Sequence, residues 1–245
     1  MLPNLGVDAR AIDVELSLNT SLALQDMGEV SALFNDSSDG SLTIQSRGLR
    51  GRWSGALVRA ECNNDLVQPV ENLLRFVVTN ELLRSGGACF HAAAVECKDG
   101  QGSFLVVGES EAGKTTLAEI FGRAKTLSDE MPAITRNEGE WRVHATPFWG
   151  DMGYGEAAGS RSLRGIFVLR GKQELATWRI QPADALQALL ARVFNYSSVK
   201  EPCEAALAIA REFAETCVVN ALSYPKEIAQ RDLEAAMQEA SARAP

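Results

Sequence analysis

Apolar and polar residues alternate in several short stretches of the first quarter of the chain. Alternation with a period of two is typical of strands that have one face in a core and one face in solvent. Turn-forming letters such as NDSSDG separate the stretches. The expected strands are Ala11–Leu18, Ser31–Phe34, Ser41–Gln45 and Ala56–Glu61. Residues 1–68 are therefore predicted to form a small β-rich N-terminal subdomain.

From residue 69 to residue 245, helical and strand-like patterns alternate. Glu71–Arg84 carries apolar residues at helical spacing and is followed by two glycines, which favour a helix that ends there. CFHAAAVEC and SFLVV are expected to be strands, TTLAEIFGRA a helix and KTLSD a short strand. AITR and WRVHA are expected to form a hairpin across NEG, and LRGIFVLR and LATWRI another across GKQE.

The C-terminal part is expected to be largely helical. One helix should run from Pro182 to about Phe194 and another from Pro202 to about Glu215, because proline is favoured in the first helical turn. CVVNAL is expected to be the last strand, and a polar helix should start at Pro225. The predicted fold class is α/β with mixed α+β character.

Composition narrows the class of protein. The chain is 46% hydrophobic and 23% charged, with a formal net charge of −8 from 32 acidic and 24 basic residues. Nucleic acids and anionic membranes need a basic face, so neither is expected as a partner. The sequence has no long apolar run, no signal-peptide pattern and no paired CxxC cysteines. These features predict a cytoplasmic protein.

The segment GESEAGKT, from Gly108 to Thr115, matches the phosphate-binding pattern G-x-x-x-x-G-K-[ST]. Glycines let successive backbone N–H groups point at one anion, and the following helix adds its positive dipole end. Lys114 would reach the β- and γ-phosphates, and the Thr115 hydroxyl would bind Mg²⁺. The residues expected to contact ATP are Gly108, Glu109, Ser110, Glu111, Ala112, Gly113, Lys114, Thr115 and Thr116.

Other motifs limit the kind of nucleotide enzyme. The chain has neither an LSGGQ-type transporter signature nor an NKxD-type guanine reader. Nucleotide enzymes with a Walker B motif carry a hydrophobic strand that ends in Asp. In this sequence that motif is present only in the short form KTLSDE. Beyond the glycine-rich stretch that starts at Gly150, Arg161 and Arg164 are candidates to contact the γ-phosphate. The alternative for both arginines is ordinary surface solvation.

Four motifs in this order resemble the catalytic core of HPr kinase/phosphorylase and its shorter paralogues. They are HAAAV, GESEAGKTT, LSDE and VHATPFWGD, and the resemblance extends from Leu82 to Leu169. It implies a P-loop kinase core related to ATP-dependent phosphoenolpyruvate carboxykinase, with a mixed sheet and C-terminal helices.

The resemblance also implies roles for individual residues. His91 matches the family histidine near the transferred phosphate. Asp129 matches the acid that takes the proton of a serine hydroxyl, and Glu130 stands where a second Asp is usual. This acid pair, together with Thr115, would supply the ligands for Mg²⁺. Each residue also has an ordinary alternative, a hydrogen-bonded strand histidine for His91 and a solvated strand end for the two acids.

Two further residues, His144 and Asp151, fall inside VHATPFWGD and are candidates to contact phosphate or substrate. Glu109 matches the acid that commonly follows the first loop glycine of the family. Glu111 departs from the pattern, because glycine is usual at its position. Both carboxylates are expected to point away from the phosphates, where they cost only a screened repulsion.

The predicted function is that of an ATP- and Mg²⁺-dependent kinase for a serine-type hydroxyl of a peptide or small protein. The VHATPFWGD variant resembles short paralogues such as the kinases of lasso-peptide precursors. The alternatives are an HPr(Ser) kinase/phosphorylase-like regulator, a non-catalytic ATP-binding scaffold, and a small-molecule kinase or carboxykinase-like enzyme. A homo-oligomer is left open.

Overall fold

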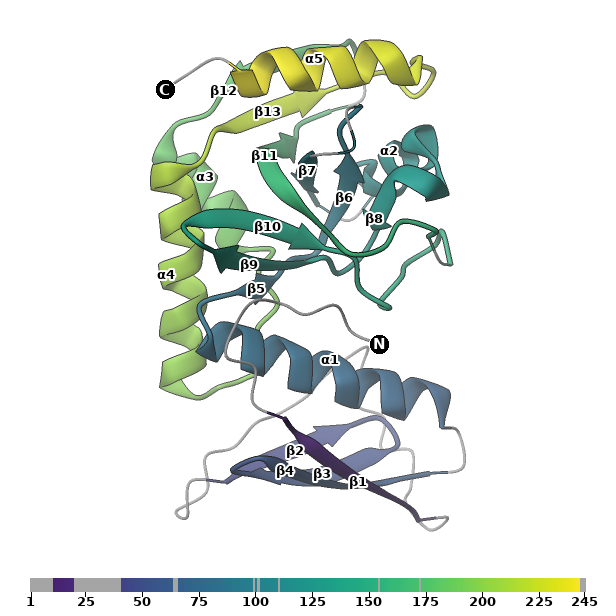
Figure 1. Ribbon diagram of the computed structural model, residues 1–245, viewed down its shortest axis with the longest axis vertical. Helices are drawn as coiled ribbons and strands as arrows, with labels where there is room; N and C mark the ends of the chain where they lie inside the picture. The colour runs from purple at the N-terminus through teal and green to yellow at the C-terminus, as the bar shows by residue number, and fades with distance from the viewer. Residues whose placement is uncertain are drawn as a thin grey trace. The chain divides into compact units, whose positions relative to one another are not determined.

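The computed structural model describes residues 11–19, 41–63, 66–98, 100, 102–109, 111–153, 155–171 and 173–242. In these residues the chain forms five α-helices and thirteen β-strands in two mixed sheets (Figure 1), which confirms the predicted mixture of α and β structure. Internal contacts divide the described chain into two units. One comprises residues 11–85 and 195–205, and the other residues 86–194 and 206–242. The sequence suggested a division at residue 68 instead.

The first unit contains a four-stranded sheet in the order β1-β4-β3-β2. Its strands are β1 (Asp13–Leu18), β2 (Leu42–Ser46), β3 (Leu49–Ser54) and β4 (Leu57–Cys62). β1 runs parallel to β4, and the other pairs are antiparallel. The predicted strands that correspond to β1, β2 and β4 are confirmed, whereas β3 was not predicted. The buried face expected for the first strand is wrong, because all six residues of β1 are exposed. The expected strand at Ser31–Phe34 lies outside the described residues.

Helix α1 (Val67–Arg84) covers the inner face of this sheet and belongs to the first unit. Leu73 and Phe76 of α1 pack onto a core formed by inward-facing residues of the strands. Those strand residues are Leu42, Ile44, Leu49, Trp53, Val58, Ala60 and Cys62. The rings of Phe76 and Tyr196 meet edge to face with centroids 5.0 Å apart, which ties residues 195–205 to this unit.

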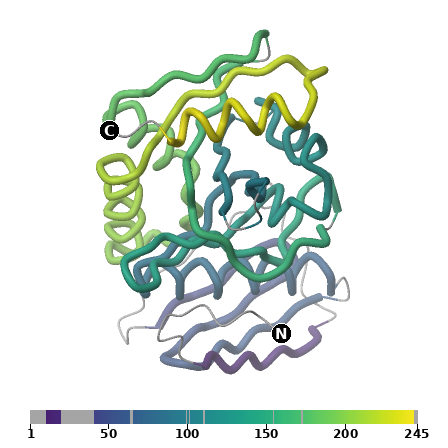
Figure 2. The backbone as a smooth tube through the Cα atoms, turned by 45° about the horizontal axis from the view of Figure 1, so that its top comes forward, coloured from purple at the N-terminus to yellow at the C-terminus, as the bar shows by residue number. Residues whose placement is uncertain are grey.

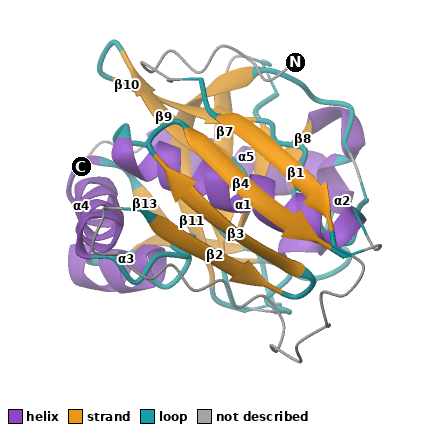
Figure 3. Ribbon diagram, turned by 90° about the horizontal axis from the view of Figure 1, so that it is seen from below, coloured by secondary structure: helices purple, strands orange, loops and turns teal. Residues whose placement is uncertain are grey.

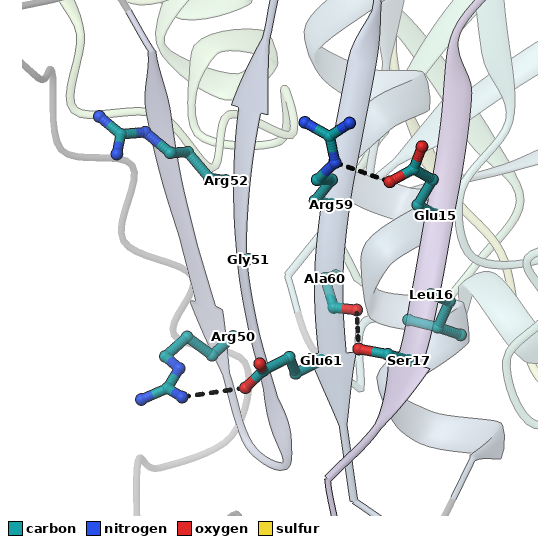
Figure 4. A pocket seen from close by; sticks show the side chains of 9 residues that line it. All are labelled: Glu15, Leu16, Ser17, Arg50, Gly51, Arg52, Arg59, Ala60 and Glu61. Carbon is teal, nitrogen blue, oxygen red and sulfur yellow. Dashed lines mark hydrogen bonds and ion pairs between the residues drawn. The ribbon is translucent and has the colours of Figure 1, made fainter.

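The outer face of the same sheet, which lies toward the viewer in Figure 3, carries several charged side chains (Figure 4). Arg50 pairs with Glu61 at 2.9 Å, and Arg59 pairs with Glu15 at 2.6 Å. These side chains and Gly51 line a groove of about 420 Å³. Ion pairs between exposed side chains contribute little to the free energy of folding. We therefore interpret this face as an ordinary solvent-exposed surface.

The second unit is built on a nine-stranded sheet. Seven strands follow the order β5-β9-β10-β11-β7-β6-β8, and β13 pairs with both β11 and β12. The strands are β5 (Ala88–Cys89), β6 (Ala92–Glu96), β7 (Gly102–Val107), β8 (Thr126–Ser128), β9 (Ala133–Asn137), β10 (Glu140–His144), β11 (Ser160–Leu169), β12 (Ala176–Arg179) and β13 (Val219–Ser223).

One of the two predicted hairpins exists. β9 and β10 pair antiparallel, so the hairpin across NEG is confirmed. The predicted pairing of β11 with β12 is wrong, because β13 lies between them, parallel to β11 and antiparallel to β12. Residues 165–169 of β11 and all of β13 are buried, whereas β12 is half-exposed or exposed. The strand that pairs with β11 is therefore the more apolar one, β13, and β12 lies at the edge beyond it.

Three helices and residues 206–216 of a fourth belong to this unit. They are α2 (Lys114–Phe121), α3 (Pro182–Leu190), α4 (Lys200–Thr216) and α5 (Gln230–Ala242), with a short 3₁₀ turn at Arg123–Lys125. α2 and α5 share one apolar cluster with β6, β7, β11 and β13. Figure 2 traces the backbone of these elements in a second view. In α4, Phe213 contacts Phe90 and Trp141 with ring centroids 5.6 Å and 4.6 Å apart. None of the helices in the described ranges is long and apolar enough to cross a membrane.

The boundaries of the C-terminal helices differ from the prediction. α3 ends at Leu190 and not near Phe194, because Val193 forms a β-bridge with Phe90 and the Phe194 N–H donates to the carbonyl of Cys89 at 2.9 Å. The last helix begins at Gln230, five residues after Pro225.

Candidate functional site

The segment that matches the phosphate-binding pattern connects a buried strand to a helix. All six residues of β7 are buried, and α2 begins at Lys114. Gly113 adopts φ 115°, a conformation that L side chains rarely adopt, so glycine is required there. Within the loop, the N–H of Ala112 donates to the carbonyl of Glu109 at 3.1 Å. The strand, loop and helix predicted from the motif are present; Ser110 lies outside the described residues.

The side chain of Lys114 is directed into this loop. Its Nζ donates to the carbonyl oxygens of Gly108 at 3.1 Å and Glu109 at 3.0 Å, and the residue is 7% exposed. Burial lowers the pKa of Lys114, the positive charge of Arg192 lowers it further, and Glu130 acts in the opposite direction. A buried cation therefore faces the backbone that the motif assigns to phosphate binding. Thr115 and Thr116 follow it in the first turn of α2 and are half-buried.

His91 and Glu130 come together beside this lysine. Nδ1 of His91 lies 3.4 Å from Oε1 of Glu130, and both side chains are about one-third exposed. The backbone fixes the pair, because the N–H of Ala92 donates to the carbonyl of Glu130 at 3.2 Å. Since the charge of Glu130 raises the pKa of Lys114, the carboxylate lies within electrostatic reach of the loop.

Asp129 points toward a different segment. Its side chain is buried, and its two carboxylate oxygens accept hydrogen bonds from the backbone N–H groups of Gly150 at 2.8 Å and Met152 at 3.0 Å. The adjacent Ser128 hydroxyl donates to the carbonyl of Phe148 at 3.2 Å. Asp129 thus holds the segment 148–152, and the exposed Asp151 lies between its two anchor points.

His144 is a buried residue at the end of β10. Its Nε2 forms a hydrogen bond with the hydroxyl of Thr135 at 2.8 Å. Burial, with a smaller contribution from the charge of Arg142, lowers the pKa of His144 to about 4. The imidazole is therefore neutral at physiological pH and is 2% exposed, which does not suit a contact with a phosphate.

The structure does not bring Arg161 and Arg164 to the loop. β7 and β11 are parallel, and Val107, which precedes the loop, pairs with Val168. At about 3.3 Å per residue, Arg161 lies roughly 23 Å along the strand from that pair, and Arg164 roughly 13 Å. Arg161 instead pairs with Glu96 at 2.6 Å. Arg164 crosses Gly102, which has no room for a side chain.

Another arginine does reach the loop, and the sequence analysis did not identify it. Nε of Arg192 donates to the carbonyl of Gly108 at 2.8 Å. Arg192 follows α3 in the stretch ALLARVF, where a single arginine in a helical pattern gives no signal of a binding role. Only the fold brings it to the first loop glycine.

A cavity of about 500 Å³ opens beside the loop. Its walls come from Gly108 and Glu109, the end of β11 at Leu169, and the end of α3 with Arg192. This volume is in the range that small-molecule sites use. In the part of the chain that the structure describes, no group of three or more His, Cys, Asp or Glu residues could hold a metal on its own.

Comparison with known proteins gives no independent assignment. No protein-family model matches the sequence, and no curated protein shows significant similarity to it.

Proposed function

We propose that this protein is an ATP-dependent kinase that transfers the γ-phosphate to a serine-type hydroxyl of a peptide or small protein, with a core like that of HPr kinase/phosphorylase. The observation that carries the proposal is the contact of the Lys114 ammonium with the carbonyls of Gly108 and Glu109, inside a loop that joins a buried strand to a helix. A buried ammonium at this point of a glycine-containing loop supports binding of a polyphosphate.

The chain's own groups account for phosphate binding. Backbone N–H groups of the loop and the start of α2 would donate to phosphate oxygens, and the Lys114 ammonium would move from the two carbonyls to the β- and γ-phosphates. The Glu109 and Glu111 side chains are both exposed, which supports the expectation that they point away from the phosphates.

The residues beside the loop suit Mg²⁺ held mainly by the nucleotide. Mg²⁺ in kinase sites takes one or two protein ligands and completes its shell with phosphate oxygens and water, so a cluster of three acids is not needed. The Thr115 hydroxyl and the partly exposed Glu130 carboxylate are the groups proposed to hold it. When bound, Mg²⁺ would neutralise charge that develops on the phosphates.

The two acids of LSDE differ in what they contact. Glu130 lies 3.4 Å from His91 and its charge acts on the loop lysine, which supports a direct role next to the phosphates. Asp129 holds Gly150 and Met152, so its first proposed role is to fix the segment 148–152. Acting as general base would require the Asp129 carboxylate to leave those two amides when the acceptor hydroxyl arrives.

This engagement of Asp129 also favours the second candidate, a non-catalytic ATP-binding scaffold. In both cases we propose the cytoplasm as the location, because ATP is available there. The peptide acceptor, and a tailoring role on a ribosomally made peptide, follow only from the family resemblance.

The test has two parts. MgATP binding is measured by isothermal titration calorimetry for the wild type, for Lys114→Ala and for the exposed-lysine control Lys98→Ala. Serine-containing peptides incubated with MgATP are then examined by mass spectrometry for added phosphate. We expect binding and transfer by the wild type and by Lys98→Ala, and loss of both in Lys114→Ala. Binding without transfer to any acceptor would favour the scaffold, and absence of MgATP binding would refute the nucleotide site itself.

A further inference from the structure

Arg192 is fixed in place by backbone hydrogen bonds on both sides. Its N–H donates to the carbonyl of Leu189 in α3 at 2.9 Å, and its own carbonyl accepts from the N–H of His91 at 2.7 Å. The β-bridge between Phe90 and Val193 continues this pairing. The position of the Arg192 side chain therefore depends on the same backbone that positions His91.

The Arg192 guanidinium contacts the loop through its Nε–H group. Nε donates to the carbonyl of Gly108 at 2.8 Å, and Nη1 donates to the carbonyl of Ala191 at 3.0 Å. The Nη2 donors have no hydrogen bond to the described residues. Arg192 also lines the cavity beside the loop, so these remaining donors border a space that a ligand could occupy.

Two cations share a single carbonyl oxygen at this point. Lys114 Nζ lies 3.1 Å from the carbonyl oxygen of Gly108, and Arg192 Nε lies 2.8 Å from the same atom. After burial, the charge of Arg192 is the main cause that lowers the pKa of Lys114, and the charge of Glu130 acts in the opposite direction. Like charges held this close repel each other, so the arrangement favours an anion that binds both.

We propose that Arg192 contacts the terminal phosphate of the nucleoside triphosphate bound at the loop, a role that no sequence motif assigned to it. The inference rests on the proposed nucleotide site. A guanidinium presents a planar set of donors that matches two phosphate oxygens, whereas Lys114 supplies a point charge. Its contact with the first loop glycine sets it beside the lysine that reaches the β- and γ-phosphates.

The experiment compares MgATP with MgADP. Dissociation constants are measured by calorimetry for the wild type, Arg192→Gln, Arg192→Lys and the control Arg164→Gln, which changes an exposed arginine nearer the opposite end of β11. Circular dichroism and thermal unfolding establish that each variant is folded. We expect Arg192→Gln to weaken MgATP binding at least tenfold and MgADP binding less than threefold. Arg192→Lys should fall between Arg192→Gln and the wild type, and Arg164→Gln should match the wild type.

Two results would overturn the inference while the nucleotide site stands. Equal losses for MgATP and MgADP in Arg192→Gln would mean that Arg192 only supports the loop, and unchanged MgATP affinity would mean that it makes no phosphate contact. If Arg192→Gln does not fold, the same comparison is made with Arg192→Lys: a larger loss of affinity for MgATP than for MgADP supports the phosphate contact, and equal losses contradict it. A wild type that binds neither nucleotide would refute the proposed function, and the inference with it.

Discussion

The hydroxyl of Tyr224 donates a hydrogen bond to the carbonyl of Gly113 at 2.6 Å. Tyr224 directly follows β13, is 1% exposed, and packs in the same cluster as Leu117 and Phe121 of α2. Burial, and then the charge of Glu119, raises the pKa of Tyr224 to about 12, so the hydroxyl keeps its proton at neutral pH. The end of β13 is thereby fastened to the last residue before α2, where the backbone has its left-handed conformation.

We expect Tyr224→Phe to weaken this attachment with little change in packing. Loss of a buried hydrogen bond should lower the free energy of unfolding by about 1–2 kcal/mol. MgATP affinity should fall several-fold, because the Gly113 carbonyl is no longer held. Chemical denaturation and calorimetry measure the two effects, and Tyr196→Phe, in the other unit, should leave MgATP binding unchanged. Wild-type MgATP affinity in folded Tyr224→Phe would mean that the hydrogen bond does not shape the loop.

Glu111 adopts φ 62°, a left-handed conformation in which glycine carries no steric penalty. The side chain costs about 1 kcal/mol there, which gives a physical reason for the glycine usual at this position in the resembling family. We expect Glu111→Gly to keep or tighten MgATP binding, and Glu111→Ala, which keeps the strain but removes the charge, to isolate the electrostatic part. A clear loss of MgATP affinity in Glu111→Gly would reveal a role for the carboxylate.

Local sequence patterns predicted where helices and strands lie better than they predicted which strands pair with each other. The hairpin of β9 and β10 was predictable because the turn at Glu138 and Gly139 is short and both strands are contiguous in sequence. The neighbour of β11 was not, because β13 reaches it after two helices. No local pattern encodes such a long-range pairing.

The candidate site was predictable where one motif carries it. Lys114 lies in the loop, as the phosphate-binding pattern requires. His91 and Glu130, which the family resemblance assigned to one site, lie next to each other. Arg192 and Tyr224 could not be predicted, because they reach the loop from segments about 80 and 110 residues away in sequence. Arg161 and Arg164 follow a glycine-rich stretch in sequence, but they lie toward the wrong end of a parallel strand.

Asp129→Asn tests the division of labour between the two acids. An amide has one acceptor oxygen, so one of the bonds to Gly150 and Met152 must be lost. We expect amide hydrogen exchange to accelerate at least tenfold at whichever of these two residues loses its acceptor. Glu130→Gln, the matched control, should keep their protection but lose phosphate transfer. Unchanged exchange in Asp129→Asn would contradict the anchoring role, whereas full protection together with lost transfer would favour Asp129 as the base.

His144 should make the stability of the protein depend on pH. Its pKa is lowered from 6.5 to about 4 in the folded state, chiefly by burial, so the unfolded chain takes up a proton first as the pH falls. Neutral His144 therefore contributes on the order of 3 kcal/mol to the free energy of unfolding. This contribution is fully present above about pH 6.5 and is lost as the pH falls from 6.5 to 4. His144→Gln should remove that part of the decline, as measured by urea unfolding at several pH values. His91→Gln, at the chain's other histidine, should keep it because His144 is still buried. Equal pH dependence in wild type and His144→Gln would show that His144 is not the group responsible.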